Sequence, residues 1–173
     1  MRRKQGWIVA VLMVLGLLQA GVLAAPAAGH GNISFGPGND VGASADTVYS
    51  VALGDLDNDG DLDIVSGSSV GEDYELIVWE NDGTPFSELW TPNDVGLLSY
   101  SVQWVAVGDL DNNGDLDIVS GDSGGRLTVW QNDGGPFTGI WTSNQVGQQF
   151  WGAPVALGDL DNDGYLDLSL IHI

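Results

Sequence analysis

Residues 51–67 read VALGDLDNDGDLDIVSG, and the same pattern returns twice later in the chain. Residues 105–121 read VAVGDLDNNGDLDIVSG, and residues 155–167 read VALGDLDNDGYLD. The copies begin at positions 51, 105 and 155, so they are spaced 54 and then 50 residues apart. A repeat of about 50 residues is typical of propellers and solenoids, in which each unit packs against its neighbours.

A second block repeats between these copies. It reads ELIVWENDGTPFSELWTPNDVG at residues 75–96 and RLTVWQNDGGPFTGIWTSNQVG at residues 126–147. Together the two blocks predict four short strands per unit, separated by turns rich in Asn, Asp and Gly. In the first unit these strands are expected near residues 51–53, 62–66, 75–80 and 86–90. Four antiparallel strands make one propeller blade, so the sequence predicts an all-β fold of propeller blades.

The length and composition agree with this fold class. The chain has 173 residues, of which 43% are hydrophobic, and it contains 26 glycines. Such a chain can bury a core and also supply many tight turns. We expect a partial propeller of about two complete repeats plus fractions, because two units cannot close a ring.

The N-terminus predicts export. Arg2, Arg3 and Lys4 precede an apolar run over residues 7–23, and small residues follow around Ala24. This pattern is typical of a signal peptide over residues 1–24, after whose removal we expect no membrane insertion. An uncleaved membrane anchor is the alternative, since the run approaches the ~20 residues that span a bilayer. The expected location is therefore extracellular, either secreted or at the cell surface.

The repeats set the other expected boundaries. Residues 47–100 form repeat 1, residues 101–150 repeat 2, and residues 151–167 the start of repeat 3. Residues 25–46 are an N-terminal segment whose NDVG at 39–42 indicates the end of a preceding blade. A strand that completes another blade is the alternative for this segment.

The last six residues, 168–173, break the repeat. They read LSLIHI where the other copies continue as IVSG. The same six letters are the translation of a transposon end used in preparing sequencing libraries. We therefore expect residues 168–173 to be a foreign tail, with a natural hydrophobic edge strand as the alternative.

The charge of the chain excludes some partners. Without the predicted leader only Arg126 remains as a basic residue against 24 acidic ones. Such a surface repels nucleic acid and anionic membranes, so neither is an expected partner, whereas cations are. The chain has no cysteine, so an exported domain of this kind depends on its core or on metal ions for stability.

Three Asp-rich loops follow the pattern DxDxDGxxD and predict Ca²⁺ sites. Ca²⁺ takes six to eight oxygen ligands, and alternate Asp residues in a tight turn aim carboxylates at one centre. Gly60, Gly114 and Gly164 are expected to take positive φ angles, and position seven is expected to contribute its backbone carbonyl. The candidate ligands are Asp55, Asp57, Asp59, Asp61 and Asp63 in loop 1 (55–63), Asp109, Asp111, Asn113, Asp115 and Asp117 in loop 2 (109–117), and Asp159, Asp161, Asp163, Tyr165 and Asp167 in loop 3 (159–167).

Two alternatives for these loops are an EF-hand-like site and diffuse surface acidity. An EF-hand needs a Glu at the twelfth position and a helix after it, whereas Ser66 and Ser120 stand there. Thirteen of the 20 aspartates fall inside the three loops, which diffuse acidity does not produce. We therefore expect the ninth-position Asp to close each site on a β-hairpin. Leucines between the ligands, at 56, 62, 110, 116, 160 and 166, are expected to point into the core.

From about residue 32 to Asp167 the sequence resembles the FG-GAP and VCBS repeats of integrin α-chain-like β-propellers. The resemblance implies a propeller, often seven-bladed, in an extracellular adhesion or ligand-binding protein with Ca²⁺ in hairpin loops on one face. It also implies that Asp55, Asp57, Asp59, Asp63 and their counterparts are ligands. The sequence departs from the family pattern at Asn113 and after Asp167.

The remaining motifs do not predict catalysis. His30 and His172 lie outside the repeats, no cysteine is present, and metal-bound aspartates are unavailable as acid or base. We expect a calcium-binding module that is not an enzyme and that binds an extracellular protein or glycan. The alternatives are the ancillary propeller region of a secreted hydrolase or lyase, and a purely structural exoprotein.

The tryptophans divide into two groups. Trp79 and Trp130 are equivalent in the repeat, as are Trp90 and Trp141, and we expect both pairs to pack between blades. Aromatic platforms for sugars are the alternative for these pairs. Trp104 and Trp151 do not align with each other and are the better candidates for a ligand surface.

Overall fold

The computed structural model describes residues 40–42, 47–70, 73–85, 90–138, 141–148 and 154–170. The chain divides into two compact units, Met1–Val41 and Gly42–Ile173. The predicted signal peptide and most of the N-terminal segment lie outside the described residues. All regular structure in the described residues is β-strand, and no helix among them is long and apolar enough to cross a membrane.

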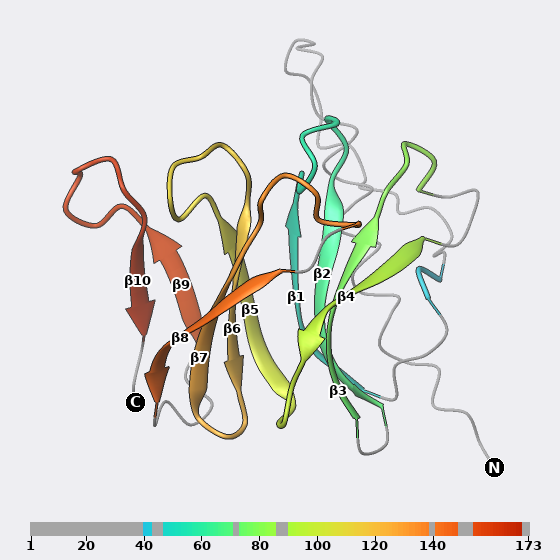
Figure 1. The fold of residues 1–173 in the computed structure, drawn as a ribbon, viewed down its shortest axis with the longest axis horizontal. Coiled ribbons are helices and arrows are strands. Elements are labelled where there is room, and N and C mark those ends of the chain that lie inside the picture. The colour runs from blue at the N-terminus through green and yellow to red at the C-terminus, as the bar shows by residue number, and fades with distance from the viewer. Residues whose placement is uncertain are drawn as a thin grey trace, which may run out of the picture. The chain divides into compact units, whose positions relative to one another are not determined.

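Each complete repeat forms one four-stranded antiparallel sheet (Figure 1). The first sheet contains β1 (Thr47–Gly54), β2 (Asp63–Val70), β3 (Asp73–Glu80) and β4 (Thr91–Leu97), in chain order. The second contains β5 (Val102–Gly108), β6 (Asp117–Asp122), β7 (Arg126–Gln131) and β8 (Thr142–Gln148). β9 (Val155–Gly158) and β10 (Asp167–Leu170) form a two-stranded sheet. The predicted all-β class and its four strands per repeat are confirmed.

The strand expected near residues 86–90 falls largely on residues 86–89, which lie outside the described part of the chain. The fourth strand of the first sheet is β4, Thr91–Leu97, which the sequence did not predict. The sequence TPNDVG resembles a turn because it contains Pro, Asn, Asp and Gly. As the outermost strand of its sheet, β4 tolerates Pro92, and a register shift opposite Leu76 and Ile77 accommodates an extra residue.

The central strands are buried on both faces. Successive side chains of a strand point to opposite faces, and on β2 both Ile64 and Val65 are buried. On β6 the equivalent Ile118 and Val119 are also buried. Apolar runs of this kind form where a sheet is covered on both sides, as in stacked blades.

The main core lies between the first and second sheets, where β5 packs against β1 and β2. A hydrogen bond from the Val105 amide to Ser50 Oγ, 3.1 Å long, joins these sheets as well. The core side chains come from both repeats, and they are Leu56, Val65, Leu76, Val78, Val95, Val102, Val105, Ile118, Trp130 and Trp141.

Glycines at the ends of the first strands allow each sheet to approach the next. A Cβ at Gly54 would lie 2.7 Å from Leu116 Cδ1, and one at Gly108 would lie 2.7 Å from Leu166 Cδ1. The equivalent Gly158 has no neighbour within 4 Å of its Cβ position among the described residues. The contact between repeats 1 and 2 therefore recurs between repeats 2 and 3.

A second repeated contact involves tryptophan. Gly96 packs on the Trp130 ring, and Gly42 packs on the ring of the equivalent Trp79, so closely that neither glycine leaves room for a Cβ. Gly42 and Gly96 end the two NDVG sequences. The assignment of residues 39–42 to a preceding unit remains a prediction.

The third repeat is less enclosed. Leu56 of loop 1 is 0% exposed, whereas the equivalent Leu160 of loop 3 is 72% exposed. The prediction that all loop leucines point into the core is therefore wrong for Leu160, because no sheet among the described residues lies over β9 and β10. The sheets of the described residues form a partial propeller-like fold, not a closed ring.

The domain boundaries within residues 47–173 remain predictions. Leu168, Ser169 and Leu170 of the predicted foreign tail lie in β10, which pairs with β9 in regular antiparallel register. Residues 171–173 lie outside the described part of the chain.

Candidate metal-binding loops

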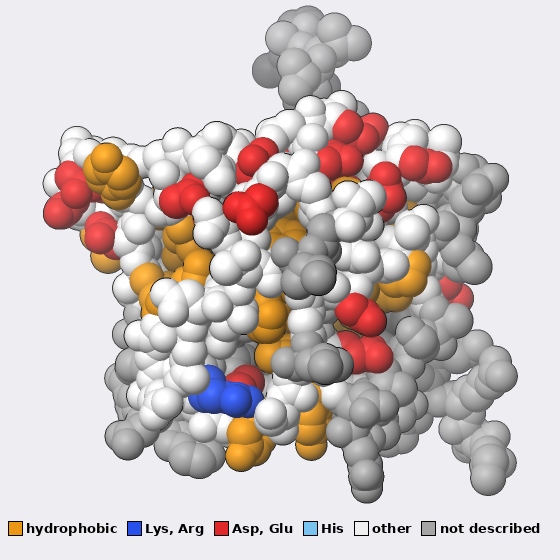
Figure 2. All heavy atoms as spheres, viewed as in Figure 1, with side chains coloured by type: hydrophobic (Ala, Val, Ile, Leu, Met, Phe, Trp, Pro, Cys, Tyr) orange, Lys and Arg blue, Asp and Glu red, His pale blue; other side chains and the backbone are white. Residues whose placement is uncertain are grey.

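The three Asp-rich loops connect the first two strands of each repeat and lie at the same end of their sheets (Figure 1). Acidic side chains gather along the edge where these loops lie (Figure 2). A hairpin turn lies beyond the end of the two antiparallel strands that it joins. Because each Asp-rich loop joins the first and second strands of its repeat, the three loops lie at the same end of their sheets.

Three aspartates of each loop converge. One carboxylate oxygen from each of positions one, three and nine lies within 4.8 Å of the other two. A single cation can therefore contact all three side chains of a group. The groups are Asp55, Asp57 and Asp63 in loop 1, Asp109, Asp111 and Asp117 in loop 2, and Asp159, Asp161 and Asp167 in loop 3.

Side-chain to backbone hydrogen bonds hold the loops in shape. In loop 1 the Gly60 amide donates to Asp55 Oδ2 at 3.0 Å, and the Asp61 amide donates to Asp59 Oδ1 at 2.8 Å. Asp and Asn favour such local bonds over a strand or helix ladder. The glycine bond recurs at 3.0 Å in both other loops, from Gly114 to Asp109 and from Gly164 to Asp159.

Two positions of each loop are in the left-handed region. Gly60, Gly114 and Gly164 have φ angles of 97°, 96° and 91°, which confirms the prediction for position six. Position four is also left-handed, which the sequence analysis missed. The residues there are Asn58, Asn112 and Asn162, with φ angles of 61°, 58° and 63°. Asparagine tolerates this region better than most residues, so an Asn two positions before the glycine was the available signal.

The ninth-position aspartate closes each loop. Asp63 is fully buried, and its two oxygens accept the Leu56 amide and the Asn81 amide, each at 2.9 Å. Because Asn81 follows β3, this carboxylate ties the loop to the third strand as well as to the hairpin. Asp117 makes the equivalent bonds to Leu110 and Asn132, at 3.0 and 2.9 Å, and Asp167 accepts the Leu160 amide at 2.8 Å. The sequence analysis did not identify Asn81 or Asn132, although both lie in the repeated ND of the second block.

Ionising the carboxylates of these loops costs free energy. Burial, with the nearby charges of Asp57 and Asp59, raises the pKa of Asp63 to about 7 in spite of its two amide hydrogen bonds. Burial also raises the pKa of Asp57 and the pKa of Asp117. A buried carboxylate is stabilised in its ionised form by a nearby positive charge, and no basic residue supplies one within these loops.

One oxygen of Asp55 also lacks a partner in the described part of the chain. Asp55 Oδ1 is buried and has no hydrogen-bond partner among the described residues. Buried polar atoms are normally paired, because leaving one unpaired costs free energy. The chemistry of the donor set, which is all oxygen and mostly anionic, fits a hard cation such as Ca²⁺.

The side chains at positions five and seven lie outside the converging groups. The position-five oxygens of Asp59, Asn113 and Asp163 accept the amide of position seven in each loop. Asp115 Oδ1 accepts a hydrogen bond from Asn58 Nδ2 at 3.0 Å. This contact leaves the backbone oxygen as the natural ligand atom of Asp115. The ligand roles of all fifteen predicted residues remain predictions, including those of the side chains outside the converging groups.

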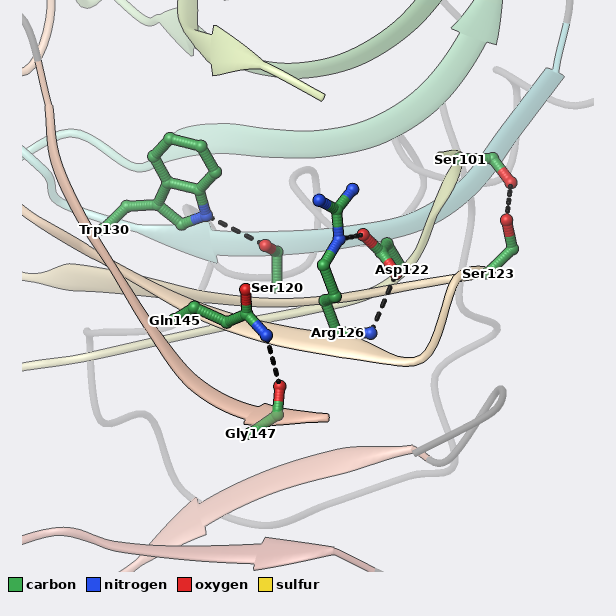
Figure 3. Close-up of polar contacts among 8 residues, drawn as sticks. All are labelled: Ser101, Ser120, Asp122, Ser123, Arg126, Trp130, Gln145 and Gly147. Carbon is green, nitrogen blue, oxygen red and sulfur yellow. Dashed lines mark hydrogen bonds and ion pairs between the residues drawn. The ribbon is translucent and has the colours of Figure 1, made fainter. Parts of the chain in front are cut away.

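The repeated tryptophans are structural. Trp79, Trp90, Trp130 and Trp141 are all buried, and the Trp130 ring nitrogen donates to Ser120 Oγ at 2.9 Å (Figure 3). The glycine contacts described above confirm packing for Trp79 and Trp130, and Trp141 belongs to the core between the sheets. Packing between blades remains a prediction for Trp90. Trp104 is 38% exposed, which is compatible with a ligand surface, and Trp151 lies outside the described residues.

Arg126, the only basic residue in the described part of the chain, is already paired. Its Nε lies 2.9 Å from Asp122 Oδ2 (Figure 3). Its guanidinium also lies 5.0 Å from the centroid of the Tyr100 ring. This group sits at the β6–β7 turn, so it does not neutralise the carboxylates of the Asp-rich loops.

Comparison with known proteins supports the repeat. A model of the FG-GAP-like repeat matches residues 109–169, a segment that begins at the first aspartate of loop 2 and includes all of loop 3. No curated protein matches the chain. Residues 109–169 are therefore similar to an FG-GAP-like repeat, and they lie in an all-β fold that is consistent with part of a β-propeller.

Proposed function

We propose that the chain is a calcium-binding β-propeller module of an exported protein and has no chemistry of its own. The observation that carries this proposal is the convergence of three carboxylates, repeated in three loops of one design. A single acidic cluster is common on protein surfaces. Recurrence in register, together with the unpaired Asp55 Oδ1, indicates a common ligand.

The expected ligands follow from the chemistry of the loops. Positions one, three, five and nine offer side-chain oxygens, and position seven offers a backbone oxygen. When bound, Ca²⁺ supplies the positive charge that these carboxylates lack. The chain supplies the preformed loop, because the glycine and asparagine turns and the amide hydrogen bonds already orient the carboxylates.

The role we propose for the ion is structural. Asp63 contacts the loop through Leu56 and the end of β3 through Asn81, so an ion bound to Asp63 connects both. A ligand that binds only the folded chain stabilises it in proportion to the logarithm of its concentration. Calcium is therefore expected to act as a cross-link in a protein without disulfides.

Thermal unfolding of the protein with excess calcium and with a chelator tests this proposal. We expect the midpoint to rise with calcium and to keep rising with its concentration. Magnesium at the same concentration is the control, and it should give a smaller shift because it demands a tighter octahedral site. An unchanged midpoint in calcium would refute the proposal.

We further propose that the module binds an extracellular protein or glycan. Exposed aromatic side chains at Tyr49, Tyr100 and Trp104 support this, because aromatic residues are favoured in ligand contacts. A glycan and protein binding screen tests it, with Trp104→Ala as the comparison. No specific ligand in the screen would favour a purely structural role.

The alternative is that the module accompanies the catalytic part of a secreted hydrolase or lyase. Both hypotheses predict the same calcium dependence. They differ in the complete reading frame, where a catalytic domain would favour the enzyme and further DxDxDGxxD units would favour adhesion.

A further inference from the structure

Asparagine side chains connect each Asp-rich loop to the next. Asn58 Nδ2 in loop 1 donates to Asp115 Oδ1 in loop 2 at 3.0 Å and lies 3.4 Å from the Gly114 backbone oxygen. One repeat later, Asn112 Nδ2 in loop 2 donates to the Gly164 backbone oxygen in loop 3 at 3.3 Å. These bonds span 57 and 52 positions in the sequence and run in the same direction in both cases.

The connected segments carry the candidate ligands. Asn58 lies between Asp57 and Asp59, and its left-handed backbone is part of the turn that shapes loop 1. Asp115 is the seventh position of loop 2, where the backbone oxygen is the expected ligand atom. The amide of Asn58 therefore acts on the backbone segment that must present an oxygen to the second ion.

We propose that Asn58 and Asn112 are positioning residues that couple neighbouring calcium loops. An ion in one loop then raises the affinity of the adjoining loop. This inference rests on the proposed calcium binding and adds to it a regulation of the same sites.

The physical basis is the loss of freedom on binding. An ion held by Asp57 and Asp59 fixes the backbone of Asn58. The side-chain amide of Asn58 is then already oriented to donate to Asp115 and Gly114. Loop 2 then loses less entropy when it binds its own ion, which is positive cooperativity. Because coupling free energies are reciprocal, an ion in loop 2 strengthens loop 1 equally.

The two connections differ in strength. Asn58 finds a charged acceptor in Asp115, and hydrogen bonds to charged groups contribute more than neutral ones. In loop 3 the equivalent residue is Tyr165, so Asn112 reaches only a backbone oxygen. Loops 1 and 2 should therefore be more strongly coupled than loops 2 and 3.

The glycine amides provide a separate reporter for each loop. Gly60, Gly114 and Gly164 each donate to the first aspartate of their own loop at 3.0 Å. A cation bound to that aspartate changes the polarisation of the N–H group, and hence its chemical shift. A calcium titration of ¹⁵N-labelled full-length protein, followed by NMR, gives one binding curve per loop.

Substituting glycine for Asn58 removes the side-chain amide and keeps the left-handed backbone conformation. Asn58→Gly tolerates the positive φ angle, so the loop should retain its shape. We expect this variant to move the Gly114 midpoint to about 3- to 10-fold higher calcium, the range expected for one hydrogen bond. Asn162→Gly is the matched control, because Asn162 has the same backbone conformation and no inter-loop bond among the described residues. It should leave the Gly60 and Gly114 curves unchanged.

Asp115→Tyr tests the acceptor. It copies the residue that loop 3 accommodates at this position. It should shift the Gly114 curve in the same direction as Asn58→Gly but by less, because Asn58 keeps its bond to the Gly114 oxygen. The double variant should match Asn58→Gly alone, because Asn58→Gly already removes the bond to Asp115. A general loss of stability would shift the calcium midpoints of all three loops together. It would also have the same effect in Asn58→Gly as in Asn162→Gly.

The outcomes separate the inference from the proposed function. Calcium-dependent shifts in the wild type with an unchanged Gly114 midpoint in Asn58→Gly would overturn the coupling and leave calcium binding intact. An equal effect of Asn162→Gly would overturn the coupling as well. If none of the three glycine amides responded to calcium, the proposed function would fall and the coupling with it.

Discussion

The side-chain amide of Asn132 donates a 2.9 Å hydrogen bond to the backbone oxygen of Leu56, 76 positions earlier in the chain. The same amide reaches the Leu116 oxygen at 3.2 Å, and the Asn132 backbone N–H donates to Asp117 at 2.9 Å. A single buried asparagine therefore joins loop 1 of the first sheet to loop 2 of the second. The candidate metal-binding loops and the contact between blades share residues, so changes in one affect the other.

We expect Asn132→Ala to destabilise the protein by about 1 kcal/mol more than Asn81→Ala. Both asparagines are buried and follow equivalent strands, but only Asn132 bonds to a neighbouring repeat among the described residues. Denaturant unfolding in the presence of calcium measures the difference. Equal losses for the two variants would show that the bond to Leu56 contributes nothing.

Gly96→Ala should lower the free energy of unfolding by about 1 to 3 kcal/mol, the usual cost of overpacking. The added methyl group would meet the Trp130 ring, which is buried and cannot move freely. Gly158→Ala is the matched control, since its Cβ position has no neighbour within 4 Å among the described residues. Unfolding curves that ranked Gly158→Ala as the more harmful change would contradict the packing described for Gly96.

The metal-free protein should be more stable at about pH 5 than at about pH 8. Burial raises the pKa of Asp63 from 3.8 to about 7, so the folded chain keeps a proton that the unfolded chain releases. This contribution is fully present below the unfolded pKa and is lost as the pH rises through the folded pKa. Asp117, whose pKa burial also raises, acts in the same direction.

Thermal unfolding in chelator at several pH values measures this effect. Asp63→Asn should flatten the profile, since the amide does not titrate. In calcium the dependence should reverse, because the ion binds the ionised carboxylates and competes with protons. A metal-free protein that gained stability between about pH 5 and about pH 8 would contradict the predicted titration.

Asp111→Asn should weaken calcium binding to loop 2 by about 10-fold or more, because affinity follows the charge count of the ligands. Asp133→Asn is a control of equal charge change, at an exposed position outside the three loops. Isothermal titration calorimetry measures both affinities. Equal effects of the two substitutions would indicate that calcium responds to general acidity and not to the loop.

The features that the sequence predicted are local. The loop turns and the carboxylate groups arise within nine residues, because Asp, Asn and Gly determine the turn through bonds to nearby amides. The strands β1 to β3 follow from apolar runs between such turns. These features could be predicted because each depends on residues that are close in the sequence.

The features that the sequence did not predict depend on contacts between repeats. Asn58 and Asn132 have partners 57 and 76 positions away, and nothing near them in the sequence indicates which groups they reach. Leu160 has the same neighbours in sequence as Leu56, yet it is exposed because no sheet within the described part of the chain covers it. β4 was not predicted because its position depends on pairing with β3, which overrides the turn-forming character of its residues.

Counting the calcium bound to the protein at equilibrium tests the central claim most directly. Equilibrium dialysis followed by metal analysis should find at least two tightly bound calcium ions per chain, from loops 1 and 2. Asp57→Asn and Asp111→Asn should each reduce the tightly bound calcium by one ion, whereas Asp133→Asn should not. Protein that takes up no calcium, or that binds the same amount when both loops are altered, would contradict the account.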